Sequence, residues 1–451
     1  MQKTIDMTQG RPLGLLLRFA LPLMLGSVCQ ILYSAADGAV VGRIAGLDAF
    51  AAIGAANFPT LLGWEIIFGL IQGFGVVFAQ LFGKKDGASL REAVANALLL
   101  SAAASVILTA AGQICAKPIL LRMGTPVEIL SSTLVYVRWM YGGIAVTLVN
   151  RLFSILLMSL GNSQAPVAAN ILSCVCNILL DLLFAGGFHW GVAGVAAATI
   201  AAQLGSALYC AAKLWSIPQM RLSRQDFHIS SPVTWQLLRL GVPMGFRNGV
   251  IAVGGLFVQA AVNSSGKLFV AGMAAAEKFF ELITFTGSAF EGAFSTYGAQ
   301  NFGAGDMPRL KKGLRCSILL SLAGAAVMMA VVALFGRNLI GLLVTGDPDD
   351  LRQVIQTGHE YLVILACTVP LMFLLCLYRA GLQGMGSALV PTLSGFVELG
   401  MRLAAVLFLP EMLGKWAVYL ANPLGWLAAA LLLGIAYHLV FRRQTRLHPA
   451  Q

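Results

Sequence analysis

Charged residues are scarce in this chain of 451 residues. Asp, Glu, Lys and Arg make up 11% of the sequence, against about 25% in a soluble domain, and apolar residues make up 58%, against about 45–50%. Several long stretches contain no charged residue at all: 93–116, 182–212, 248–266, 316–336 and 416–441. A chain this apolar cannot cover its surface with polar groups in water, so we expect an integral membrane protein embedded in a lipid bilayer.

Strict alternation of apolar and polar residues is also absent, so the spans are expected to be α-helices and not β-barrel strands. The patterns of several enzyme classes are missing as well. Gly83, Lys84 and Lys85 lack the spacing and the Ser or Thr of a phosphate-binding loop, and neither H-E-x-x-H nor G-x-S-x-G occurs. We therefore predict a protein that is not an enzyme, carries no cofactor and draws any energy from an ion gradient.

Two further features argue against disulfides or metal ligation by cysteine and against nucleic-acid binding. The eight cysteines are scattered, mostly inside apolar runs, and are interpreted as small buried hydrophobic residues. No basic stretch is interleaved with aromatic residues, so a nucleic-acid partner is not expected.

Breaks at polar, Pro and Gly clusters divide the chain into twelve predicted helices. The apolar run Leu13–Val41, which contains the first predicted helix, is too long for the apolar core of a cleaved signal peptide. The predicted ranges are 13–37, 48–81, 92–114, 133–157, 165–185, 191–214, 234–262, 267–299, 311–336, 356–379, 389–409 and 417–441.

The distribution of Lys and Arg predicts the orientation of these helices. An even number of spans places both termini on one side of the membrane. That side receives 17 Lys and Arg residues and the opposite side receives eight. The positive-inside rule therefore places both termini in the cytoplasm, and we expect the inner cell membrane as the location.

An internal repeat divides the chain into two halves. The phrase AQLFGKKD at 79–86 returns as AQNFGAGD at 299–306, and Leu17-Arg18-x3-Pro22 returns as Leu238-Arg239-x3-Pro243. Six helices in each half make the halves parallel repeats, an arrangement used by alternating-access transporters. We predict an N-terminal lobe at 1–220, a cytoplasmic linker at 221–232 and a C-terminal lobe at 233–451.

Acidic residues at membrane depth are candidates for function, because an ionised side chain there costs several kcal/mol. Asp37 ends the first predicted helix and Asp181 lies in the fifth. Asn177 and Asp181 are four residues apart on one helix face, and Gln30 and Tyr33 stack similarly with Asp37. We interpret these residues as a cation site, while a helix cap at Asp37 and a helix–helix contact at Asp181 are the structural alternatives.

Other charged residues inside predicted helices leave more than one interpretation open. Glu65, Glu281 and Glu291 either line a cavity for a cationic substrate or pair with neighbouring basic residues. Glu398 and Arg402 are four residues apart, which favours an ion pair within one helix. The glycine pairs Gly69-x3-Gly73 and Gly241-x3-Gly245 are expected to allow close helix approach.

Several ordered motifs resemble the multidrug and toxic compound extrusion (MATE) family over nearly the whole chain. They are LGNSQAPVAAN with NILLD and HWGVAGVAAAT between 160 and 203, AQNFGAGD at 299–306, and YLANPLGW at 419–426. The resemblance implies twelve helices in two six-helix bundles that open as a V. It also implies exchange of an organic cation for H⁺ or Na⁺ by a multidrug efflux transporter.

Within this family the chain resembles the DinF-like branch. That resemblance implies that Asp37, Asn177 and Asp181 form the H⁺ or Na⁺ site, with Gln30, Tyr33 and Thr199 as polar neighbours. Two features depart from the family pattern. The usual Pro after the Asp of helix five is Leu182, and helix ten carries Arg379 with no clear carboxylate.

Three functions remain to be distinguished. The first is a monomeric, cation-coupled exporter of organic cations or other drugs. The second is a lipid-linked oligosaccharide flippase of the related superfamily, which the basic residues at 151, 247, 278, 379 and 402 keep open. The third, a membrane receptor without transport activity, is disfavoured by the repeat and by the lack of a sizeable domain outside the membrane.

Overall fold

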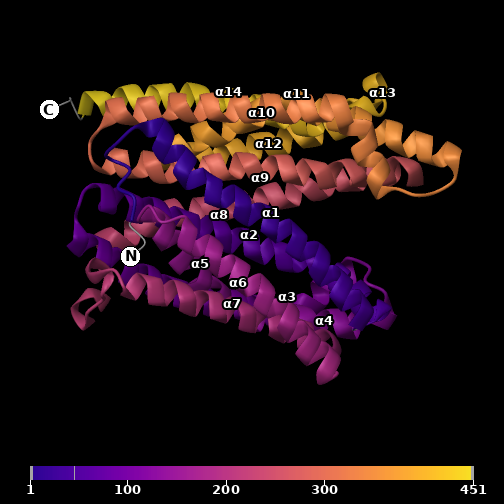
Figure 1. Ribbon diagram of the computed structural model, residues 1–451, viewed down its shortest axis with the longest axis horizontal. Coiled ribbons are helices and arrows are strands. Elements are labelled where there is room, and N and C mark those ends of the chain that lie inside the picture. Colours follow the sequence, from indigo (N-terminus) through magenta and orange to yellow (C-terminus); the bar gives the residue numbers. More distant parts are fainter. Residues whose placement is uncertain (1–3, 45, 448–451) are drawn as a thin grey trace. The chain divides into compact units, whose positions relative to one another are not determined.

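Helices account for almost the whole of the computed structural model, which describes residues 4–44 and 46–447 (Figure 1). The side chains at 32, 34–37, 39, 44, 47 and 447 lie outside the description. The first half contains α1 (Pro12–Ile44), α2 (Leu47–Gly83), α3 (Gly87–Arg122), α4 (Val127–Gly142), α5 (Ile144–Ser159), α6 (Gln164–Asp181), the π-helical turn η1 (Leu182–Gly187) and α7 (Gly191–Trp215).

Two short 3₁₀ turns, η2 (Pro218–Met220) and η3 (Arg224–Phe227), lead to the second half. It contains α8 (Ser231–Ser264), α9 (Lys267–Gly303), α10 (Met307–Leu343), α11 (Pro348–Gly384), α12 (Leu389–Phe408), the short α13 (Pro410–Leu413) and α14 (Trp416–Leu447).

The twelve predicted membrane helices all have a counterpart. Ten described helices are long and apolar enough to cross a bilayer, and α4 with α5 forms an eleventh span. The twelfth is α9, 37 residues long, whose Glu277, Lys278, Glu281 and Glu291 lower its hydropathy. One prediction was wrong in detail, because the continuous helix at 133–157 is interrupted at Gly143 and bends by 47° between α4 and α5.

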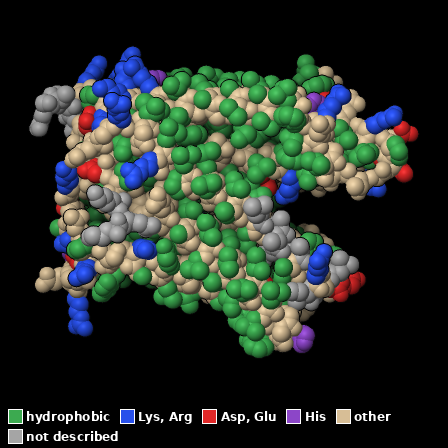
Figure 2. Space-filling model, viewed as in Figure 1, with side chains coloured by type: hydrophobic (Ala, Val, Ile, Leu, Met, Phe, Trp, Pro, Cys, Tyr) green, Lys and Arg blue, Asp and Glu red, His purple; other side chains and the backbone are tan. Residues whose placement is uncertain are grey.

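Side-chain chemistry on the surface matches a bilayer environment. On the face drawn in Figure 2, hydrophobic side chains cover the length of the helices, and Lys and Arg side chains lie mostly near helix ends. Exposed large apolar residues are numerous and include Leu25, Val106 and Ile114. Such residues would be costly in water and are favourable against lipid.

The chain forms two compact units, and two segments belong to the unit opposite to their place in the sequence. Unit 1 contains residues 1–6 and 21–245, and unit 2 contains residues 7–20 and 246–451. The divisions therefore fall inside α1 and α8, close to Pro22 and Pro243. These prolines occupy equivalent positions in the sequence repeat. The predicted lobe and linker boundaries at 220, 221–232 and 233 stay a prediction.

In unit 1, glycines bring α2 against the first half of α8. A Cβ atom on Gly69 would lie 2.4 Å from the Met244 carbonyl oxygen, and one on Gly73 would lie 2.5 Å from the Gly241 Cα. Neither distance is tolerated between non-bonded atoms, so only glycine fits at these crossings. The predicted close approach of the two glycine pairs is confirmed.

The segment before α8 is held on α3 by one buried amide. The Asn96 side chain donates to the His228 carbonyl oxygen at 3.1 Å and accepts from the Thr234 hydroxyl at 2.9 Å and the Ser230 backbone N–H at 3.3 Å. Asp226 adds an ion pair with Arg91 at 3.6 Å. These contacts fix the path of the chain between α7 and α8.

The repeated phrase forms the same helix–turn–helix junction in both units. Lys85 and Gly305 occupy the equivalent position with φ of 60° and 77°, and their N–H groups bond to Phe82 and Phe302 carbonyl oxygens, both at 3.0 Å. The next residue, Asp86 or Asp306, then caps the following helix through a backbone N–H three residues later.

The capping contact also affects the ionisation of the repeated aspartate in unit 1. Because its carboxylate accepts hydrogen bonds from the Ser89 backbone N–H and hydroxyl, the pKa of Asp86 is lowered. Asp86 is therefore an anion at neutral pH, the form that suits a helix N-terminus.

The repeated glutamine has a related role in each unit. Gln300 accepts a hydrogen bond from the Met7 backbone N–H at 2.9 Å, and Asn301 donates to the Met7 carbonyl oxygen at 3.2 Å. In unit 1, Gln80 accepts from Gln236 at 3.4 Å. Each glutamine thus contacts a segment at or just before the start of a proline-containing helix. The duplicated phrase therefore encodes a tertiary contact as well as a turn.

The left-handed position of the junction gives a stability prediction. Lys85→Gly is expected to raise the free energy of unfolding by up to about 1 kcal/mol, because glycine adopts positive φ without the Cβ penalty. Gly305→Ala is expected to lower it by a similar amount. Thermal unfolding of detergent-purified protein measures both. The same direction of change in the two variants would contradict the assignment.

Candidate functional site

A polar cluster joins α1 and α6 in unit 1. The Tyr33 hydroxyl donates to the Asn177 side-chain oxygen. One turn away on α1, the Gln30 side-chain oxygen accepts from Asn170 at 2.9 Å and from the Cys174 thiol at 3.8 Å. These contacts link side chains 140 or 144 positions apart in the sequence, on two helices that cross the membrane.

Asp181 lies one helical turn beyond Asn177 and is 1% exposed, while Asn177 is 2% exposed. The helical geometry changes immediately after Asp181, where α6 passes into the π-helical turn η1. π-Helical turns are rare and occur often at functional sites. Close packing supports the turn, because a Cβ atom on Gly194 of α7 would lie 2.9 Å from the Phe184 backbone.

Two other residues predicted for this site, Thr199 and Asp37, do not take part in the contacts described above. The hydroxyl of Thr199 donates to the Val195 carbonyl oxygen of its own helix at 3.0 Å. The side chain of Asp37 lies outside the described residues, although its backbone belongs to α1. The structure thus brings Tyr33 and Asn177 together between α1 and α6, with the buried Asp181 one turn further on α6, and the role of this set as a cation site stays a prediction.

Unit 2 contains a buried cluster of opposite charges. Arg379 of α11 donates to the Glu398 carboxylate of α12, and Arg402, one turn further on α12, lies 3.7 Å from the other Glu398 oxygen. Arg247 of α8 is buried close by and interacts electrostatically with Arg379. The predicted pairing of Glu398 with Arg402 is confirmed, but the contact between α11 and α12 was missed.

Glycines lie beside the arginine side chains. A Cβ atom on Gly395 would lie 2.8 Å from the Arg247 Cγ, and one on Gly254 would lie 3.6 Å from an Arg402 terminal nitrogen. A Cβ atom on Gly425 would lie 3.6 Å from the Arg402 Cγ. Only the distance at Gly395 is too short for a Cβ atom, so Gly395 leaves room for the Arg247 side chain, whereas the distances at Gly254 and Gly425 are ordinary van der Waals contacts.

The remaining acids of α9 have separate surroundings. Glu277 accepts a hydrogen bond from the Tyr361 hydroxyl at 2.7 Å, and Glu281 forms an exposed ion pair with Lys278 at 3.4 Å. Glu291 lies close enough to the Cys376 thiol for an electrostatic interaction. In unit 1, the half-buried Glu65 is close enough to Arg151 for an electrostatic interaction. Their role in lining a substrate cavity stays a prediction.

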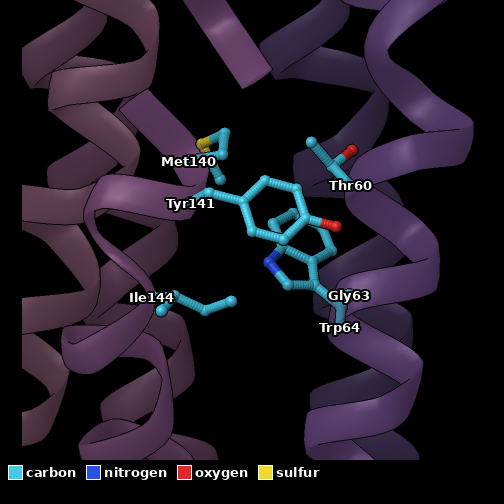
Figure 3. A pocket seen from close by; sticks show the side chains of 6 residues that line it. All are labelled: Thr60, Gly63, Trp64, Met140, Tyr141 and Ile144. Atoms are coloured by element: carbon cyan, nitrogen blue, oxygen red, sulfur yellow. The ribbon is translucent and has the colours of Figure 1, made fainter. Parts of the chain in front are cut away.

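A small cavity in unit 1 lies where the chain bends between α4 and α5 (Figure 3). Thr60, Gly63 and Trp64 of α2 line it together with Met140, Tyr141 and Ile144. Its volume is about 10 Å³, roughly the space that one water molecule needs. The cavity is therefore too small for an organic substrate.

Removal of the Glu398 carboxylate tests whether the buried ion pairs stabilise the protein more than an exposed charge does. Glu398→Gln leaves Arg379 and Arg402 without their anionic partner, and loss of one member of a buried pair costs about 3–5 kcal/mol. A large fall in thermal stability of the purified protein is expected. Glu411→Gln, an exposed acid in the same unit, is the control and should change little. Equal stability of the two variants would refute the assignment.

Comparison with known proteins agrees with this architecture. The MatE family model matches the chain twice, at residues 22–183 and 243–406, which confirms the duplication. The chain is 27% identical to "Probable multidrug resistance protein YpnP" of Bacillus subtilis, with 82% of this chain and 81% of the relative covered. It is 25% identical to "Probable multidrug resistance protein YoeA" of the same organism, with 94% and 93% covered.

Solved structures match the fold. An outward-facing multidrug resistance MATE transporter superposes with a TM-score of 0.88 over 99% of both chains at 20% identity. The two matches to the family model together cover more than half of the chain. The chain therefore belongs to the MatE family and is a twelve-helix membrane transporter, not an enzyme.

Proposed function

We propose that the protein exports drugs and related organic compounds in exchange for H⁺ or Na⁺. The observation that carries the proposal is the hydrogen bond between Tyr33 of α1 and the buried Asn177 of α6, one turn from the buried Asp181. The names of its relatives, multidrug resistance proteins, support export of drugs. Organic cations are the substrate class that the sequence resemblance implies.

The chemistry of the cluster suits reversible cation binding. The ionised form of a carboxyl group away from water lacks solvation, and a bound proton or Na⁺ offsets that cost. The Asn177 amide and the Tyr33 hydroxyl supply neutral oxygens, which together with carboxylate oxygens are ligands that hard cations accept. Asp37, on α1 with Tyr33, would supply the second carboxylate.

Ion binding is coupled to the conformational change because the proposed ion site lies between two helices. A proton or Na⁺ at this site changes the charge between α1 and α6 and so shifts the balance between inward-open and outward-open states. By reciprocity, substrate binding weakens ion binding by the same factor. The transporter acts as a monomer in the inner membrane, with both termini in the cytoplasm. This orientation is supported by the excess of Lys and Arg on that side.

A second candidate function is flipping of a lipid-linked oligosaccharide. The three buried arginines of unit 2 favour it, because such a substrate carries phosphate groups. A requirement for an ion gradient would favour the first function.

Neutralisation of the two aspartates tests the proposal. In proteoliposomes, Asp37→Asn and Asp181→Asn should each reduce gradient-driven efflux of an organic cation to the level seen when the gradient is collapsed. Separate ΔpH and Na⁺ gradients identify the ion.

The matched control is Glu128→Gln, which removes an exposed acid of α4 in the same unit and should leave efflux unchanged. Each variant must show the same amount of inserted protein and the same thermal stability as the parent. Full gradient-driven efflux by both Asp variants would refute the proposal.

A further inference from the structure

Arg247 is a buried cation whose hydrogen-bond donors are only partly used. It lies near the middle of α8 and is 4% exposed. Its Nε and one terminal nitrogen donate to the neutral Asn248 side-chain oxygen at 3.2 and 2.7 Å. The other terminal nitrogen has no hydrogen-bond partner among the described residues. A guanidinium at membrane depth is costly, and an unused donor adds to that cost.

The acids in this cluster make their contacts elsewhere. Glu398 uses one oxygen for Arg379 and the other for Arg402, and Glu291 interacts electrostatically with the Cys376 thiol. Both acids act on Arg247 only through longer-range electrostatics. Arg247 therefore lacks a contacting counter-ion among the described residues.

The neighbouring arginines also keep free donors. The Nε atoms of Arg379 and Arg402 are buried and have no hydrogen-bond partner among the described side chains and backbone. Arg379 and Arg402 thus share Glu398, Arg247 has no contacting acid among the described residues, and three N–H-bearing nitrogens of these guanidinium groups remain without a partner there. The chemical group that completes such a set is an anion with two or more acceptor oxygens.

We propose that Arg247, together with Arg379 and Arg402, binds a carboxylate or phosphate group of the transported compound. This inference rests on the proposed export function and narrows its substrate class to organic compounds that carry an acidic group, with or without a cationic one. A planar guanidinium pairs with two oxygens at once, which lysine cannot do. Gly395 leaves room for the Arg247 side chain itself, because a Cβ atom there would lie 2.8 Å from the Arg247 Cγ.

A pair of matched dyes tests this site without any ion gradient. One is a cationic xanthene dye with its carboxylate esterified, and the other is the same dye with the carboxylate free. Equilibrium binding to the detergent-purified full chain is measured by fluorescence anisotropy. Arg247→Gln should weaken binding of the free acid by roughly ten- to a hundredfold, the worth of one charge-assisted hydrogen bond, and leave the ester unchanged.

Two further variants separate binding from folding. Arg247→Lys keeps the charge and should restore part of the affinity for the free acid. Arg337→Gln removes an exposed arginine of α10 in the same unit and should change neither dye. An equal loss of affinity for both dyes in Arg247→Gln would show a structural role for Arg247 and overturn the inference. Unchanged affinity for the free acid would also overturn it.

Competition identifies the source of the acidic group. Inorganic phosphate that displaces the free-acid dye supports a site for soluble phosphate compounds. Phosphatidylglycerol in mixed micelles that displaces it, where inorganic phosphate does not, supports a lipid headgroup. Since binding is measured without a gradient, loss of this site leaves the efflux test of the aspartates intact, and failure of that test leaves the binding result intact.

Discussion

Hydrocarbon offers no hydrogen-bond partner, and this constraint governs where polar groups can lie in the chain. Backbone groups are satisfied inside helices, and polar side chains that face lipid would cost several kcal/mol each. The described helices accordingly expose Leu, Val and Ile and turn residues such as Asn177 and Asp181 inward. A buried polar side chain in this protein therefore needs an explanation, either a partner or a ligand. The buried polar groups of the two units are satisfied in different ways.

In unit 1 the buried groups are mostly neutral, and a carboxyl group lies at a change in helical geometry. In unit 2 they are charged, and arginine donors outnumber the acceptors that contact them. The first arrangement suits a small cation that comes and goes with a change of one charge. The second suits an anionic group held by several donors. Gene duplication thus gave the two halves the same helix junctions, at Asp86 and Asp306, but different buried chemistry.

Apolar runs and the breaks between them were sufficient to predict twelve helices, because most spanning helices are long and apolar whatever packs against them; hydropathy alone would have missed α9. The repeat and the role of the glycine pairs could also be predicted from the sequence, since close helix contact requires glycine at positions such as Gly69 and Gly73. The break at Gly143 and the π-helical turn after Asp181 were not, because both depend on packing against neighbouring helices. The contact of Arg379 with Glu398 joins two helices, and spacing along one helix cannot reveal it.

Similar reasoning explains the candidate sites. A lone acid in an apolar run, such as Asp181, can be found from sequence because an ionisable residue at membrane depth is rare whatever packs against it. Arg247 was visible only as one of five basic residues within helices, and its free donor became apparent only once the surrounding acids were placed.

The most direct test of ion coupling is whether substrate binding expels the ion. Substrate is added to purified wild-type protein in weakly buffered solution, and the release of H⁺ is followed with a pH indicator, or the release of Na⁺ with a sodium-sensitive dye. The account predicts stoichiometric release of one of the two ions, which disappears in a variant without the Asp181 carboxylate. Saturable substrate binding with no release of either ion would contradict it.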